Sequence, residues 1–156
     1  MPNTPSQAQM NAILADLQTL VDGGTLKAVI VDDLTKVNPL DRNWSGFPSA
    51  VVIPPTLNSS EFEDQANNLR EYTWYIMVVT TPENMPSSDP TYLAGLVDNV
   101  CAVFDADATL QGTANGAVMP AILEPPGPIS SNSVTYVVFY VTFKARQLVP
   151  AGVQIN

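Results

Sequence analysis

Two long apolar stretches decide the fold of this chain: Leu69–Thr81 (LREYTWYIMVVTT) and Val134–Gln147 (VTYVVFYVTFKARQ). Successive side chains of a strand point to opposite faces, and each stretch places apolar residues on both faces. The alternating sets are Tyr72, Trp74, Ile76, Val78 against Thr73, Tyr75, Met77, Val79, and Val134, Tyr136, Val138, Tyr140 against Val137, Phe139, Val141, Phe143. We therefore expect a strand at Leu69–Thr81 that is covered on two sides. The second strand would run roughly 45 Å, so we expect it to extend past its own sheet and pair elsewhere.

Two amphipathic helices are predicted, one near the N-terminus and one between the two long strands. Thr4, Pro5 and Gln7 have the residue types and spacing of an N-cap, a first helical residue and a capping box. Gly23-Gly24 ends this helix, and Asp89-Pro90 begins the other. Apolar residues recur at helical spacing in both: Met10, Ile13, Leu14, Leu17, Leu20, Val21 and Leu93, Leu96, Val97, Val100, Cys101, Phe104.

Shorter strands are predicted at Leu26–Leu34, Ser49–Ile53 and Ala117–Leu123. Pro54-Pro55 is expected to stop the second of these, because proline cannot donate to a ladder, and residues 56–68 are then a polar connection. The segment Pro125–Pro128 predicts a turn or a polyproline segment. The whole chain, residues 1–156, is thus predicted to be one α+β domain. Its sheet would be antiparallel or mixed, with about four to five strands and both helices on one face.

Composition points to covered surfaces rather than to nucleic acid. Charged residues make up 13% of the chain, about half the usual fraction of roughly 25%. Interface cores are depleted in charge, so a surface covered by neighbours fits; a monomer with a neutral polar coat is the alternative. The net charge of −9 argues against tight DNA binding but suits a conduit that DNA slides past.

No catalytic constellation is recognisable. The chain has no histidine, which removes the usual general base, the nucleophilic triads and a common zinc ligand. Asp32-Asp33 and Asp105/Asp107 offer too few ligands for a metal, and we expect solvated acids there. Cys101 lies on an apolar helix face, where a buried small hydrophobe is expected. We therefore predict no enzyme, no catalytic residue, no cofactor and no metal; a small carboxylate- and metal-dependent enzyme is the distant alternative.

No targeting or membrane-spanning segment is evident in this sequence. Met1–Thr4 lacks the basic residues of a secretion signal, and no apolar run approaches the roughly 20 residues that span a bilayer. The single Cys101 allows no internal disulfide. We expect a protein that folds in a reducing cytosol and has no membrane partner.

Three residues are candidates for contacts with other subunits. Phe62 lies in the long acidic connection, and loop aromatics often anchor interfaces. Lys144 and Arg146 share one face of the last strand, where they would contact an acidic neighbour or DNA backbone, or else protect a strand end. Trp44 and Phe47 also lie in a loop, and we expect them to fold back onto the domain's own core.

The order of elements resembles that of the tail terminator proteins (tail completion, head-to-tail joining) of long-tailed bacteriophages. The matching segments are QMNAILADLQTLV, FPSAVVIPP, REYTWYIMVVTTP, DPTYLAGLVDNVCAVFD and VTYVVFYVTFKAR, and they span nearly the whole chain. The proline-rich segment Leu123–Ile129 departs from the pattern and leaves the final strand pairing open.

This resemblance implies a virion protein at the junction of tail and neck, assembled in the host cytoplasm. It would form a homohexameric ring that caps the tail tube, ends its polymerisation and joins the tail to the head connector. Its partners would be further copies of this chain, the tail tube protein and the head-completion or connector protein. DNA would pass through without sequence-specific binding. Another neck adaptor or a tail tube subunit is the alternative.

Overall fold

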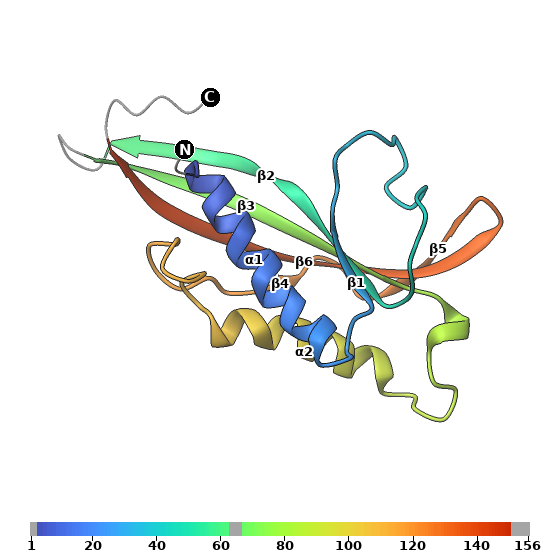
Figure 1. Cartoon of the computed structure of the whole chain (residues 1–156). Helices are drawn as coiled ribbons and strands as arrows, with labels where there is room; N and C mark the ends of the chain where they lie inside the picture. The colour runs from blue at the N-terminus through green and yellow to red at the C-terminus, as the bar shows by residue number, and fades with distance from the viewer. Residues whose placement is uncertain (1–2, 63–66, 151–156) are drawn as a thin grey trace.

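The elements of the chain follow the predicted order, with one additional strand (Figure 1). The structure is a computed structural model that describes residues 3–62 and 67–150. The elements are α1 (Pro5–Asp22), β1 (Ala28–Val31), β2 (Ser49–Phe62), β3 (Asn67–Thr80), the 3-10 turn η1 (Pro82–Asn84), α2 (Tyr92–Ala106), β4 (Ala121–Ile122), β5 (Gly127–Ser131) and β6 (Val134–Pro150).

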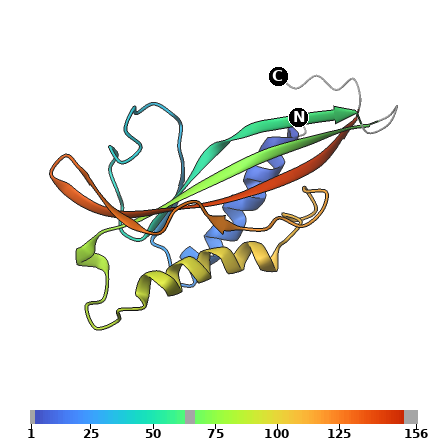
Figure 2. The same cartoon turned by 180° about the vertical axis from the view of Figure 1, so that it is seen from behind.

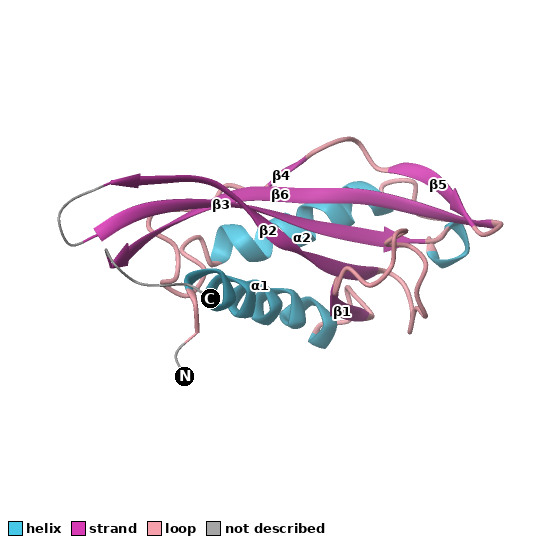
Figure 3. Ribbon diagram, turned by 90° about the horizontal axis from the view of Figure 1, so that it is seen from above, coloured by secondary structure: helices cyan, strands magenta, loops and turns pink. Residues whose placement is uncertain are grey.

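The strands form one mixed sheet that is strongly twisted (Figure 3). Their order is β1-β2-β3-β6-β4, and β5 pairs with the start of β6. Only β1 and β2 are parallel; the other pairs are antiparallel. β3 matches β6 from Asn67 opposite Pro150 to Thr80 opposite Val137. The last strand is therefore paired along its length within its own sheet, and the expectation that it would extend past this sheet is wrong.

Both helices cover one face of the sheet, which confirms the α+β prediction (Figure 2). The main core lies between that face and the helices, where Leu17 of α1 and Phe104 of α2 pack with Trp74 and Phe143. The capping box at Thr4 and Gln7 forms as predicted. α2 begins at Tyr92, slightly later than predicted, and the preceding turn is held by the Asp89 carboxylate, which accepts hydrogen bonds from the backbone and hydroxyl of Thr91.

β2 does not stop at Pro54-Pro55 but continues to Phe62, which corrects the prediction. β1 ends at Val31, opposite Val52, so both prolines lie where β2 has become an edge strand. A missing N–H on a free edge removes no ladder bond, and a register shift between Ile53 and Thr56 accommodates the prolines. Most of the predicted connection at 56–68 is therefore strand.

The turn predicted at Pro125–Pro128 also proved to be partly strand. Gly127–Ser131 pairs with Val134–Val138, which makes a sheet of six strands instead of about four to five. β5 is an outer strand, so Pro128 is tolerated there for the same reason as the prolines of β2. The predicted strand at Ala117–Leu123 shrinks to Ala121–Ile122.

A loop at residues 32–48, here called the crossing loop, covers the second face of the sheet. Leu40 of this loop is buried with Val51, Met77 and Tyr136 in a smaller core cluster, against which Trp44 packs. The expected cover on both faces of the central strands is therefore confirmed where the crossing loop packs on them. At the opposite end the sheet continues as the paired ends of β2, β3 and β6, here called the arm, which comprises residues 56–62, 67–73 and 144–150.

Candidate functional site

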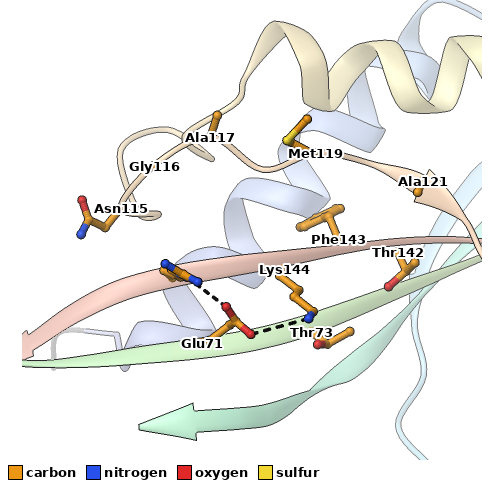
Figure 4. A pocket seen from close by; sticks show the side chains of 11 residues that line it. Glu71, Thr73, Asn115, Gly116, Ala117, Met119, Ala121, Thr142, Phe143 and Lys144 are labelled. Atoms are coloured by element: carbon orange, nitrogen blue, oxygen red, sulfur yellow. Dashed lines mark hydrogen bonds and ion pairs between the residues drawn. The ribbon is translucent and has the colours of Figure 1, made fainter. Parts of the chain in front are cut away.

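Lys144 and Arg146 lie on one face of β6, as their spacing predicts, and both meet Glu71 of β3 (Figure 4). Arg146 Nε donates to Glu71 Oε2 at 2.9 Å, and Lys144 Nζ lies 3.9 Å from Oε1. The Glu71 side chain is 15% exposed, whereas those of Arg146 and Lys144 are 59% and 68% exposed. The hydrogen bond from Arg146 is the main reason that the pKa of Glu71 lies below its ordinary value.

This cluster leaves positive charge exposed on the arm. One carboxylate faces two cations, and both cations carry their charged heads in solvent. Only six residues of the chain are basic, so the pairing of two of them on one face is a distinct local feature of an acidic protein. Both charged heads are exposed and can therefore contact a further acidic group.

A groove of about 520 Å³ runs along the outer edge of β6 beside this cluster (Figure 4). β6 residues Phe143, Lys144 and Arg146 form one side, and the chain from Asn115 to Ala121 forms the other. The groove is closed at one end by the Asn115 N–H, which donates to the Arg146 carbonyl at 2.6 Å, and at the other by β4. Glu71 and Thr73 of β3 also line the groove, so its charged side chains are those of the ion-pair cluster.

The aromatic candidates divide in two. Trp44 and Phe47 fold back as expected: their rings lie 5.4 Å apart and both contact the Tyr136 ring. The Trp44 indole N–H donates to the Leu40 carbonyl at 3.2 Å. Phe62 is the last residue of β2 and pairs with Asn68; its side chain lies outside the part of the structure that is described.

The acid pairs serve local structure. Asp32 is buried, lies 3.4 Å from the Arg42 guanidinium and accepts from the Leu34 N–H, so it is not the solvated acid that was expected. Asp33 is exposed, and hydrogen bonds from the Thr35 hydroxyl and N–H hold its pKa below the ordinary value. Neither points to a metal site.

Asp107 faces a second acid, but this acid is not Asp105, with which it was paired in the sequence analysis. It meets Asp16 of α1, and each of these two carboxyls has a buried Oδ2 without a hydrogen-bond partner. Burial first, and then Asp107, raises the pKa of Asp16 to about 7. Asp105, which the sequence paired with Asp107, is exposed.

A buried polar contact beside the arm was not anticipated. Gln9 of α1 is fully buried; its amide accepts from the Trp74 indole N–H at 2.9 Å and donates to the Thr113 carbonyl at 3.4 Å. It thereby ties α1 to β3 and to the loop beside the groove. A signal was present: Gln9 and Asp16 both interrupt the apolar stripe that includes Ile13 and Leu17, and polar groups at such positions need partners.

Within residues 3–62 and 67–150, no group of three or more Cys, Asp or Glu side chains is placed to hold a metal ion. The described helices include none with the length and apolar character to cross a bilayer. Burial, followed by the charges of Asp105 and Asp98, raises the pKa of the Cys101 thiol, which disfavours its reactive thiolate. No protein-family model matches this chain, and no curated protein matches it.

Proposed function

We propose that this chain is a structural subunit that assembles head to tail into a ring. We further propose that the ring is the tail terminator of a long-tailed bacteriophage, which caps the tail tube and joins the tail to the head connector. The ring is supported by one observation: in the part of the chain that the structure describes, the arm has a free strand edge on each of its two opposite sides.

One free edge belongs to β2. β1 accompanies β2 only as far as Val52, and no strand of the described chain lies beside its outer edge from Ile53 to Phe62. The other belongs to β6: within the described residues, β5 and β4 pair its outer edge up to Thr142, and Asn115 meets it once more at Arg146. Free strand edges readily pair with another chain, and proteins that stay monomeric usually block them.

Exposed apolar side chains follow both sides of the sheet. Val31 and Leu57 lie on the side of β1 and β2, and Met119, Leu123 and Ile129 lie on the side of β4 and β5. Their exposed fractions reach 51% for Leu57 and 81% for Met119. Such residues on two different surfaces are what a subunit with a neighbour on each side would bury.

Two different edges favour a head-to-tail contact over a symmetric pair. A contact between unlike surfaces generates a ring when the rotation closes and a filament when it does not. The copy number of six, the tail tube and connector partners, and the location at the tail-neck junction come from the resemblance to tail terminators. The net charge of −9 suits a ring through which DNA passes without sequence-specific contacts.

The test is the mass and shape of the native particle. Light scattering over a concentration series, with electron microscopy of the same samples, should give single rings of about six subunits of 16.7 kDa, or about 100 kDa. Because rings can form fully only on their partner, the series is repeated with purified tail tubes. Open stacks would favour a tube subunit, and a monomer under every condition would refute the proposal.

A further inference from the structure

We infer that neighbouring copies join through the arm, with the β2 edge of one copy beside the β6 edge of the next, so that Glu61 approaches Arg146 of its neighbour. This inference rests on the proposed head-to-tail assembly and names the surfaces that would make it. It follows from strand direction, from the level of the free edges and from the placement of charge.

Strand direction determines that the joint is parallel. β2 and β6 are each antiparallel to β3, so within one copy they run in the same direction (Figure 3). Rotation about a ring axis preserves the direction of every strand relative to that axis. The β6 edge of one copy and the β2 edge of the next therefore meet as a parallel pair.

The two free edges also lie at the same level of the sheet. Ser59 pairs with Glu71, which pairs with Arg146; Glu61 pairs with Leu69, which pairs with Leu148. The part of the β6 edge beyond the Asn115 contact is thus level with the last residues of β2. A neighbour shifted sideways by the width of one arm would bring these segments together.

Charge on one face is complementary across this joint. Side chains alternate along each strand, so the register puts Glu61 on the same face as Lys144 and Arg146. Glu61 is exposed, and Arg146 uses its Nε for Glu71 while its other guanidinium nitrogens can still donate. In the joint, Glu61 would lie diagonally across from Arg146 of the neighbour, a distance that long side chains can bridge.

Disulfide trapping tests the joint directly. In a Cys101→Ala background, Glu61→Cys protein is mixed with tagged Leu148→Cys protein and oxidised. A mixed disulfide dimer is expected, with little self-crosslinking of either variant alone. Within one copy β3 separates these positions by roughly 10 Å, beyond the reach of a disulfide, so a doubly substituted chain should crosslink only between copies.

Matched controls determine the register in which the two strands pair and the face of the sheet on which the cysteines meet. Ser59→Cys mixed with Leu148→Cys covers a joint shifted by one pleat, whereas Ser60→Cys lies on the opposite face and should not crosslink. Rings without a mixed disulfide in either register would overturn the joint and leave the ring intact. Absence of rings would overturn both, and self-crosslinking of Leu148→Cys alone would indicate a symmetric contact instead.

Charge reversal gives an independent measurement. Glu61→Arg should weaken ring assembly by roughly threefold to tenfold per joint, because it places a cation against the neighbour's cations. Glu83→Arg makes the same charge change on η1, away from the arm, and should leave assembly unchanged. Equal effects of the two substitutions would show that net charge, and not this contact, governs association.

Discussion

Asp16 and Asp107 place two carboxyl groups against each other between α1 and the end of α2, and this pair makes stability depend on pH. Asp16 is 9% exposed, and its buried Oδ2 and that of Asp107 have no donor partner unless one of the two carboxyls is protonated and bonds to the other. The pKa of Asp16 is raised from 3.8 to about 7, first by burial and then by Asp107. The folded protein therefore binds this proton more tightly than the unfolded chain does.

This difference in proton binding determines whether the free energy of unfolding rises or falls with pH. Below pH 4 the carboxyl is protonated in both states, and its protonation favours the folded state fully. As pH rises from about 4 to about 7, the unfolded chain releases its proton first, so the free energy of unfolding falls. A shift of roughly three units corresponds to at most about 4 kcal/mol; screening by nearby solvent should reduce this to ~1–2 kcal/mol.

Replacing Asp16 with Asn tests this reasoning. The amide cannot ionise and can donate to Asp107, so Asp16→Asn should raise the free energy of unfolding by ~1–2 kcal/mol at pH 8 and change it little at pH 3, below the pKa of the carboxyl in the unfolded chain. Urea denaturation followed by tryptophan fluorescence measures both values. Asp105→Asn is the control, because it removes the same charge from an exposed site on α2. An equal effect at pH 3 and pH 8, or a loss of stability at pH 8, would refute the argument.

Four further substitutions probe the core, the crossing loop and the ion-pair cluster. Gln9→Ala should destabilise the fold by ~1–3 kcal/mol in urea denaturation, because it leaves the buried Trp74 indole N–H unpaired. Trp44→Ala should cost ~2–3 kcal/mol and make the crossing loop the first site of limited proteolysis, an order that mass spectrometry can check. Arg146→Ala should cost more than Lys144→Ala, both within ~0.2–1 kcal/mol, because only the arginine is within hydrogen-bond distance of the shared glutamate; the reverse order in thermal unfolding would contradict this.

Local signals were sufficient for much of the fold. The capping box at Thr4 and the glycines at 23–24 determine where α1 begins and ends, and both depend on neighbours in sequence. The period-two alternation in β3 assigned Trp74 and Met77 to opposite faces, and they are observed in the two separate core clusters. Burial on both faces was therefore predictable at the centre of the sheet.

The errors arose where the answer depends on distant strands. Pro54, Pro55 and Pro128 argue against a strand only if the strand is central, and their edge positions follow from where β1 ends and how β5 pairs. The ion-pair cluster also depends on strands that are distant in sequence. The common face of Lys144 and Arg146 is readable from spacing, but Glu71 is 75 residues away from Arg146, and only the β3–β6 register brings them together.

The edges of the arm are partly blocked, and this restricts which segments of β2 and β6 can pair with another copy. On β2 the prolines at 54 and 55 remove backbone donors from the first part of the free edge. On β6 the Asn115 N–H bonds to the Arg146 carbonyl, and the pairing with β4 extends along β6 only as far as Thr142 in the described chain. The edges left open beyond these blocks are level with each other; Glu61 lies on the open β2 edge, and Arg146, where the open β6 edge begins, has the opposite charge on the same face. Because copies with a net charge of −9 repel one another in general, association is favoured only where such local complementarity outweighs that repulsion.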